Sequence, residues 1–144
     1  MEFNELIPEL SVSDFKKALE FYTKILGFKI EYQRKESNFA FLSREKAQIM
    51  IEKTNNKWKT GKLEYPFGRG INIQIEVKDI ETIIKKLKKE KYPIKFGPEE
   101  NQYRKGNKFL SFKEILVMDP DGYVLRFSQQ TKNNNKSIKK SEKH

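Results

Sequence analysis

The sequence contains no cysteine, and its single histidine, His144, is the last of its 144 residues. Without cysteine the chain has no disulfide, no thiolate metal site and no cysteine nucleophile. A Ser-His-Asp triad and a histidine-rich metal site both need an imidazole inside the fold. His144 ends a lysine-rich segment that we expect to be mobile. We therefore expect no histidine-dependent catalytic site.

Long apolar runs are also missing. No stretch of about 18 apolar residues occurs, so we expect no membrane-spanning segment. The first ten residues combine acidic side chains with no apolar run, which does not fit a secretory signal peptide and favours a cytoplasmic protein. The length of 144 residues, with 36% hydrophobic and 35% charged residues, predicts one domain with an economical core and a heavily charged surface.

Positive charge is abundant, with a formal net charge of +10. Residues 131–144 are rich in lysine and asparagine and lack apolar periodicity, which predicts a disordered basic tail after a domain at residues 1–130. A second cluster falls on one predicted helix and is interpreted as its solvated face, with a phosphate-binding track as the alternative. It consists of Lys85, Lys86, Lys88 and Lys89. We find no stripe of aromatic and basic side chains on a single strand face, so no nucleic-acid partner is expected.

The first half of the pattern covers about residues 5–53. Alternating apolar residues over Ile7–Val12 predict a strand, and Asp14 is a suitable N-cap for a helix that ends at Gly27. The apolar stripe of that helix is Phe15, Ala18, Leu19, Tyr22 and Leu26. Three strands are predicted to follow, at residues 28–34, 39–43 and 47–53. A loop is predicted after them, at residues 54–70.

The same pattern returns at about residues 71–129. Ile71–Val77 alternates strictly, and Asp79 is placed to cap a second helix. The apolar stripe of this helix is Ile80, Ile83, Ile84 and Leu87. A shift of 65 residues superposes the two halves, with Leu10 on Ile75, Val12 on Val77 and Asp14 on Asp79. Strands are predicted near 94–96, 112–118 and 123–129, with a long loop at 97–110. The repeat predicts an α+β fold of two βαβββ modules, whose curved mixed sheets surround a cup and carry the helices on their outer faces.

Several segments resemble the vicinal oxygen chelate superfamily, which includes glyoxalase I, extradiol dioxygenases, fosfomycin-resistance enzymes and bleomycin resistance proteins. The resemblance covers about residues 5–129 and is carried by Pro8-Glu9-Leu10-Ser11-Val12-Ser13-Asp14, Ala18-Leu19-Glu20-Phe21-Tyr22, Leu26-Gly27-Phe28, Ile75-Glu76-Val77-Lys78-Asp79-Ile80 and Met118-Asp119-Pro120-Asp121-Gly122-Tyr123. The Asp-Pro-Asp-Gly stretch also has a structural interpretation, because proline and glycine in these places make a tight hairpin turn.

Enzymes of that superfamily hold a divalent metal with four cup-facing side chains. The resemblance puts those positions at Ile7, Glu52, Asn72 and Arg126. Only Glu52 is an ordinary ligand, because Ile7 has no donor atom, Asn72 is a weak donor and Arg126 carries a fixed positive charge. One carboxylate does not hold zinc, nickel or iron, so we expect neither a metal nor another cofactor. The alternative is a metal-dependent lyase or dioxygenase of the same superfamily that uses other ligands.

Loss of the metal is shared with the bleomycin resistance proteins, which are similar in fold and sequester the antibiotic without modifying it. The loop segments 56–61 and 64–70 resemble that branch. The resemblance implies a small-molecule ligand of the bleomycin type, a homodimer with a groove shared by two subunits, and exchange of the first strand. Pro8 fits the hinge of such an exchange and equally fits an edge strand.

The alternation predicts which side chains line the cup. They are Glu9, Gln48, Met50, Glu52, Asn72, Gln74, Glu76, Glu114 and Arg126. Four carboxylates against one arginine suit a cationic ligand, unless these groups pair with one another. Trp58, the only tryptophan, is predicted to stack on the ligand or fill an interface, with a packed loop anchor as the alternative. Tyr103 and Phe39, with Phe41, offer further flat surfaces, although the two phenylalanines also suit an ordinary core.

Overall fold

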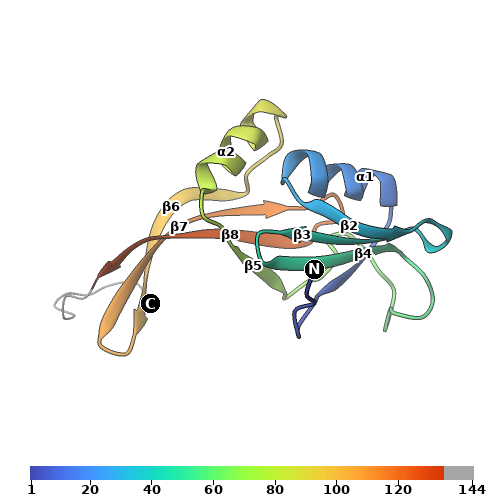
Figure 1. Cartoon of the computed structure of the whole chain (residues 1–144), viewed down its shortest axis with the longest axis horizontal. Coiled ribbons are helices and arrows are strands. Elements are labelled where there is room, and N and C mark those ends of the chain that lie inside the picture. Colours follow the sequence, from blue (N-terminus) through green and yellow to red (C-terminus); the bar gives the residue numbers. More distant parts are fainter. Residues whose placement is uncertain (135–144) are drawn as a thin grey trace. The chain divides into compact units, whose positions relative to one another are not determined.

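The computed structural model describes residues 1–134 (Figure 1). The elements are β1 (Glu9–Val12), α1 (Phe15–Glu20), the π-helix η1 (Phe21–Ile25), β2 (Lys29–Arg34), the 3-10 helix η2 (Lys35–Ser37), β3 (Phe39–Arg44), β4 (Ala47–Lys53), β5 (Asn72–Glu76), α2 (Ile80–Lys89), β6 (Phe96–Lys105), β7 (Lys108–Met118) and β8 (Val124–Asn134). They form two compact units: Met1–Ile71 with Met118–Tyr123, and Asn72–Val117 with the residues from Val124 on. The predicted α+β class and the two βαβββ modules are confirmed.

The first unit contains a four-stranded sheet in the order β1-β4-β3-β2. β1 pairs with β4 in parallel, and the other pairings are antiparallel. Alternate residues of the strands point to opposite faces. One face is apolar and is covered by α1 (Figure 1). Its buried strand residues are Leu10, Val12, Ala40, Leu42, Ile49 and Ile51. The opposite face is therefore the one on which a binding site is sought.

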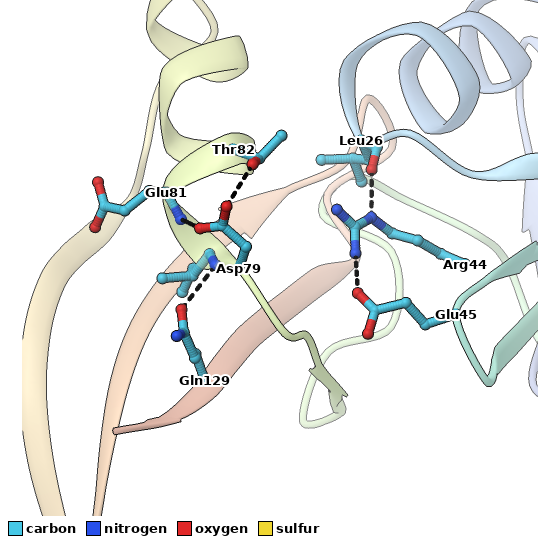
Figure 2. A network of polar contacts seen from close by, with 8 residues as sticks. Leu26, Arg44, Glu45, Asp79, Glu81, Thr82 and Gln129 are labelled. Atoms are coloured by element: carbon cyan, nitrogen blue, oxygen red, sulfur yellow. Dashed lines mark hydrogen bonds and ion pairs between the residues drawn. The ribbon is translucent and has the colours of Figure 1, made fainter. Parts of the chain in front are cut away.

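The first helix differs from the uniform helix that its spacing predicts. It is α-helical only to Glu20 and continues as the π-helix η1. Asp14 is the N-cap, and its Oδ1 accepts from the backbone N–H of Lys17 at 3.0 Å. At the other end, Arg44 Nε donates to the carbonyl of Leu26 at 2.9 Å while Arg44 Nη1 donates to Glu45 at 2.7 Å (Figure 2). A helix-end carbonyl is thus satisfied by a side chain from β3.

The Asp119–Gly122 turn belongs to the first unit, although it lies more than 90 residues away from α1 in the sequence. Tyr22 donates its hydroxyl hydrogen to Asp119 Oδ2 at 2.7 Å, and Ser13 donates from both N–H and Oγ to the Asp121 carboxylate. Burial raises the pKa of Asp119, and the Tyr22 hydrogen bond opposes that rise. Both carboxylates are used to fasten the turn, in agreement with its structural interpretation.

Tyr123 attaches the same turn to β1. Its hydroxyl donates to the carbonyl of Ser11 at 2.9 Å, and burial together with the Asp119 and Asp121 carboxylates raises its pKa to about 12. Its ring lies against Gly68, where an added Cβ would approach a ring carbon to 2.5 Å. Gly68 also has a φ of +69°, so glycine is required there both for space and for backbone conformation.

The second unit contains a sheet in the order β5-β8-β7-β6. β5 and β8 are parallel, and β6 and β7 are antiparallel. Helix α2 buries four side chains, which are those of the predicted stripe: Ile80, Ile83, Ile84 and Leu87. Asp79 is its N-cap, as Asp14 is of α1, so the predicted repeat of the cap is confirmed.

The capping of α2 uses two side chains (Figure 2). Asp79 accepts from the backbone N–H of Glu81 at 3.1 Å and from the Thr82 hydroxyl at 2.9 Å. Gln129, on β8, accepts from the N–H of Ile80 at 2.8 Å. The first N–H groups of a helix have no partner within it. Here they are satisfied in part by the neighbouring strand, which fixes the start of α2 on the sheet.

The prediction of a long loop at 97–110 is wrong. β6 and β7 form a long antiparallel hairpin that turns between Lys105 and Lys108, and the predicted strand 94–96 contributes only Phe96. Most of β6 is exposed, so its sequence has no apolar alternation to reveal it. Gly97, the first residue of the predicted loop, lies where the register shifts and has a φ of +87°. A Cβ there would lie 2.5 Å from the carbonyl oxygen of Glu114.

Strand β8 continues to Asn134, so the first four residues of the predicted tail are strand in the structure. The remainder of that predicted tail, 135–144, lies outside the described residues. Within residues 1–134 no helix is both long and apolar enough to cross a membrane.

Candidate functional site

Two rows of side chains cross the face of the first sheet opposite α1. Residues that are direct partners in neighbouring strands share a face. The strand register gives one row of Arg34, Phe39, Glu52 and Ser11, and a second row of Tyr32, Phe41, Met50 and Glu9. Gln48 follows in a third row, opposite Ser43. Glu9, Gln48, Met50 and Glu52 therefore lie together on this face, as the alternation predicts.

Aromatic rings occupy the middle of this face, which we call the aromatic-acidic face and which consists of these first two rows. Phe39 and Phe41 are buried, with exposed fractions of 2% and 1%. Tyr32 stacks on Phe41 with a centroid separation of 5.3 Å and an interplanar angle of 14°. Phe3 meets the edge of Phe41, also at 5.3 Å. Phe39 and Phe41 are thus both well packed and placed among the predicted site residues.

A basic side chain, Arg34, lies beside the aromatic rings, although the sequence predicts no aromatic and basic residues together on one strand face. Tyr32 and Arg34 are two residues apart on β2 and share one strand face. The Arg34 guanidinium carbon lies 3.9 Å from the centroid of the Phe39 ring. The alternation of β2 is hard to read because a bulge separates Ile30 from Tyr32.

The two acids of this face influence each other. Glu9 and Glu52 are diagonal neighbours on the parallel strands β1 and β4. Partial burial raises the pKa of Glu9, the Glu52 charge raises it further, and the Arg34 charge lowers it. An approaching cation would favour the charged form of Glu9. This part of the face therefore suits a positively charged group.

Glu52 also connects the sheet to the loop that carries Trp58. Asn55 Nδ2 donates to Glu52 Oε1 at 2.9 Å. Asn55 Oδ1 accepts from the backbone N–H groups of Lys57 and Trp58 at 2.8 and 3.2 Å. The Trp58 side chain is 64% exposed, which argues against the packed loop anchor. Sequence reasoning missed Asn55, whose only signal was its position in an Asn-Asn pair at the start of a loop.

The second sheet carries the remaining predicted residues on a face of its own. Asn72, Gln74 and Glu76 alternate along β5 and are all exposed. Their partners on β8 are Val124, Arg126 and Ser128. Arg126 Nη2 donates to Gln74 Oε1 at 2.6 Å. Asn72, Gln74, Glu76 and Arg126 are therefore brought together, as the alternation predicts.

Glu114 behaves differently from the other predicted acids. It is buried, with 5% exposure, and lies 3.9 Å from Arg126 Nη1. Asn101 Nδ2 donates to it at 3.0 Å, and the Tyr103 hydroxyl makes a short hydrogen bond to the same oxygen. Burial and the Glu114 hydrogen bond raise the pKa of Tyr103. Tyr103, predicted in a loop, is in strand β6, and Glu114 is one of the acids that pair within the protein.

The four positions that the resemblance assigns to a metal do not form a normal donor set. Ile7 and Arg126 offer no lone pair to a cation, and Asn72 offers only an amide oxygen. Among the described residues no group of three or more His, Cys, Asp or Glu side chains could hold a metal ion. Glu52 is instead engaged by the Asn55 amide. The donor chemistry of these positions does not fit a catalytic divalent metal.

Comparison with known proteins gives a consistent result. The family model described as "Glyoxalase/Bleomycin resistance protein/Dioxygenase superfamily" matches residues 6–127. Bleomycin resistance proteins of Geobacillus stearothermophilus and Staphylococcus aureus are each 26% identical over 135 residues, covering 88% of this chain and 96% of theirs. The crystal structure of TioX from Micromonospora sp. ML1 has a TM-score of 0.68 at 14% identity, covering 90% of this chain and all of that one.

Proposed function

The chain belongs to the Glyoxalase/Bleomycin resistance protein/Dioxygenase superfamily, and from this premise we propose that it binds a bleomycin-type cationic glycopeptide and sequesters it without chemical modification. The observation that carries the proposal is the aromatic-acidic face, on which the carboxylates of Glu9 and Glu52 share one sheet face with buried rings. Cationic and planar parts of one ligand can be bound there together. The 26% identity to bleomycin resistance proteins supports the same class of ligand.

Trp58 is proposed as the main stacking residue. Its indole is mostly exposed, and the Asn55 amide holds its backbone to the Glu52 carboxylate. The Glu52 carboxylate is therefore tied to the same loop as Trp58, and a ligand that stacks on the indole can also contact this carboxylate. Stacking contributes about 0.5–1.5 kcal/mol beyond area burial, and a charge-assisted hydrogen bond about 1.5–3 kcal/mol. Several such contacts suffice for about micromolar affinity.

On the second sheet, Glu76 is the proposed acidic contact. It is exposed at the end of β5. Glu114 is buried and bonded to Asn101 and Tyr103, so we assign it to holding Arg126 rather than to the ligand. Gln74, which accepts from Arg126, helps to fix the same guanidinium. Met50, Glu9 and Phe39 on the first sheet, and Asn72, Tyr103 and Arg126 on the second, are further proposed ligand contacts.

The competing function is a metal-dependent lyase or dioxygenase of the same superfamily. It would require a donor set other than Ile7, Glu52, Asn72 and Arg126, whose chemistry does not fit a metal. The binding function uses these residues as they stand. Stoichiometric zinc, nickel or iron in the purified protein, lost in Glu52→Gln together with lyase activity, would favour the enzyme.

We further propose that the protein acts as a homodimer. β1 and β2 are edge strands of the first sheet, and edge strands are natural sites of association. The segment before β1 exposes large apolar side chains, with Leu6 at 85% and Phe3 at 61% exposure. A second copy of the chain would cover them. Light scattering at micromolar concentration should give twice the chain mass, and a stable monomer would refute this part of the proposal.

The direct test is a titration with metal-free and copper-loaded bleomycin. Trp58 is the only tryptophan, so its fluorescence reports on the loop alone. Bleomycin should change that fluorescence and raise the melting temperature, which should increase with the logarithm of the free ligand concentration once that concentration exceeds the dissociation constant. Glu64→Gln, an exposed change in the same loop region, serves as the control and should bind like wild type. No change of fluorescence or melting temperature at high bleomycin concentration would overturn the proposed ligand.

A further inference from the structure

The aromatic-acidic face already holds a planar cation, which belongs to the chain itself. The Arg34 guanidinium carbon lies 3.9 Å from the Phe39 ring centroid and 5.9 Å from that of Tyr32. Arg34 and Phe39 are direct partners in the antiparallel pair β2–β3, so the arginine side chain folds back over its own neighbour. The electron-rich face of the ring attracts the cation.

One carboxylate stands next to that ring, and a second lies one strand further on. Glu52 is the partner of Phe39 on its other side, in β4. Glu9 is diagonal to Glu52 on β1. Burial and the Glu52 charge raise the pKa of Glu9, and the charge of Arg34 opposes that rise. An aromatic floor with acids beside it has the composition of a site for an organic cation.

Directional bonds do not hold Arg34 in this place. Across residues 1–134, its guanidinium makes no ion pair within 4.0 Å and no side-chain hydrogen bond, and its position follows from the ring and the nearby charges. By contrast, Arg44 and Arg126 are each fixed by bonds to an acceptor. A ligand group that stacks on Phe39 therefore has no strong internal bond to break.

We propose that Phe39, with Glu52 beside it and Glu9 one strand further on, is a subsite for a planar delocalised cation of the guanidinium or aromatic amidinium class, and that Arg34 occupies this subsite as an internal competitor. The inference deepens the proposed function, on which it rests for the identity of the natural ligand. A weakly hydrated planar cation suits such a ring better than a compact ammonium. Occupancy by Arg34 lowers the apparent affinity in proportion to the fraction of time that the ring is covered.

The test uses benzamidine, a planar aromatic cation, and benzamide, its neutral counterpart of similar shape. Their dissociation constants are measured by NMR titration for wild type, Arg34→Gln and Lys35→Gln. Lys35→Gln is the matched control, since it removes an exposed positive charge at the next position without touching the ring. Arg34→Gln should bind benzamidine at least tenfold more tightly than wild type, while Lys35→Gln should stay within about twofold of wild type. Benzamide affinity should not change in either variant.

Several results would overturn the subsite. If Arg34→Gln increased the affinity for benzamidine and for benzamide equally, the site would be an apolar pocket without a preference for cations. Equal gains in both variants would indicate only the loss of net charge. Adding Glu52→Gln to Arg34→Gln should cancel most of the gain, and a retained gain would exclude the carboxylate.

A bleomycin titration of the same proteins separates the two proposals. If Arg34→Gln gains affinity for benzamidine but no variant binds bleomycin, the subsite is supported and bleomycin is refuted as the ligand. If the wild type binds bleomycin but Arg34→Gln does not bind benzamidine more tightly, the proposed ligand is supported and the subsite is refuted.

Discussion

Asn55 joins the Glu52 carboxylate to the backbone of Trp58: its amide donates to Glu52 at 2.9 Å and accepts from the Trp58 N–H at 3.2 Å. The only tryptophan of the chain is thus held to the acidic part of the sheet by one side chain. Both functional groups of that amide are used, the NH2 as the donor and the carbonyl oxygen as the acceptor.

We expect Asn55→Asp to loosen this loop. Aspartate keeps the acceptor for the two N–H groups but loses the donor and places a second negative charge beside Glu52. Quenching of Trp58 fluorescence by acrylamide should rise, and bleomycin affinity should fall roughly tenfold through the disordered loop. Asn56→Asp is the control, because it adds the same charge one residue away. Identical behaviour of the two variants would show that Asn55 has no special role.

The second prediction concerns Tyr22→Phe and pH. Asp119 loses a hydrogen bond in this variant, so its pKa, already raised by burial, rises further. A carboxyl whose pKa is higher in the folded state costs stability once it ionises, and that cost is absent below the unfolded value of about 3.9. The loss of unfolding free energy in urea should be about 1–3 kcal/mol at pH 7 and smaller near pH 4. Exposed Tyr65→Phe should have little effect at either pH, and an equal loss for Tyr22→Phe at both would contradict the assignment.

Gly97→Ala should destabilise the protein. The residue has a φ of +87°, and a Cβ would come within 2.5 Å of the Glu114 carbonyl oxygen, a backbone atom that cannot easily move. A non-glycine residue in such a conformation costs about 1–3 kcal/mol. Gly61→Ala is the natural comparison, since nothing lies within 4 Å of its added Cβ. Urea unfolding should separate the two variants, and equal midpoints would show that the close approach at Gly97 is readily relieved.

The proposed ligand contacts should differ in strength and in salt dependence. Trp58→Ala should weaken bleomycin binding at least as much as Glu52→Gln or Glu76→Gln, because it removes both stacking and buried area. Affinity of the wild type should fall as salt rises, since exposed charges are screened. Isothermal titration at two salt concentrations measures both effects. A salt-independent affinity would mean that the carboxylates do not contact a cation.

The sequence predicted those elements whose apolar spacing is strong. The stripe of α2 and the alternation of β5 each have one buried and one exposed face, which is the condition under which a period can be read. β6 has no such contrast, because most of its residues are exposed, so its sequence predicts a loop. β3 presents the opposite difficulty, because the run Phe39-Ala40-Phe41-Leu42 is apolar on both faces. Its sequence alone therefore could not decide whether the two rings belong to the core or to the binding face.

The sequence predicted which acidic residues lie on the candidate faces, but not which of them are paired within the protein. Alternation placed Glu9, Glu52 and Glu76 on polar faces, and it also placed Glu114 there. Whether an acid is free depends on partners that are distant in sequence, such as Arg126 for Glu114. Arg34 was missed for a related reason, because the bulge in β2 hides the face to which it belongs.

The Asp119–Gly122 turn also has a consequence for biosynthesis. The Tyr22 and Ser13 side chains of the first unit find their acceptors only in residues that the ribosome adds about a hundred positions later. Until then the nascent amino-terminal half carries a tyrosine hydroxyl and a β1 end without their native partners. We therefore expect a separately expressed fragment of residues 1–71 to be less stable than the same segment within the whole chain, and to gain protection from proteolysis when the remaining residues are supplied in trans.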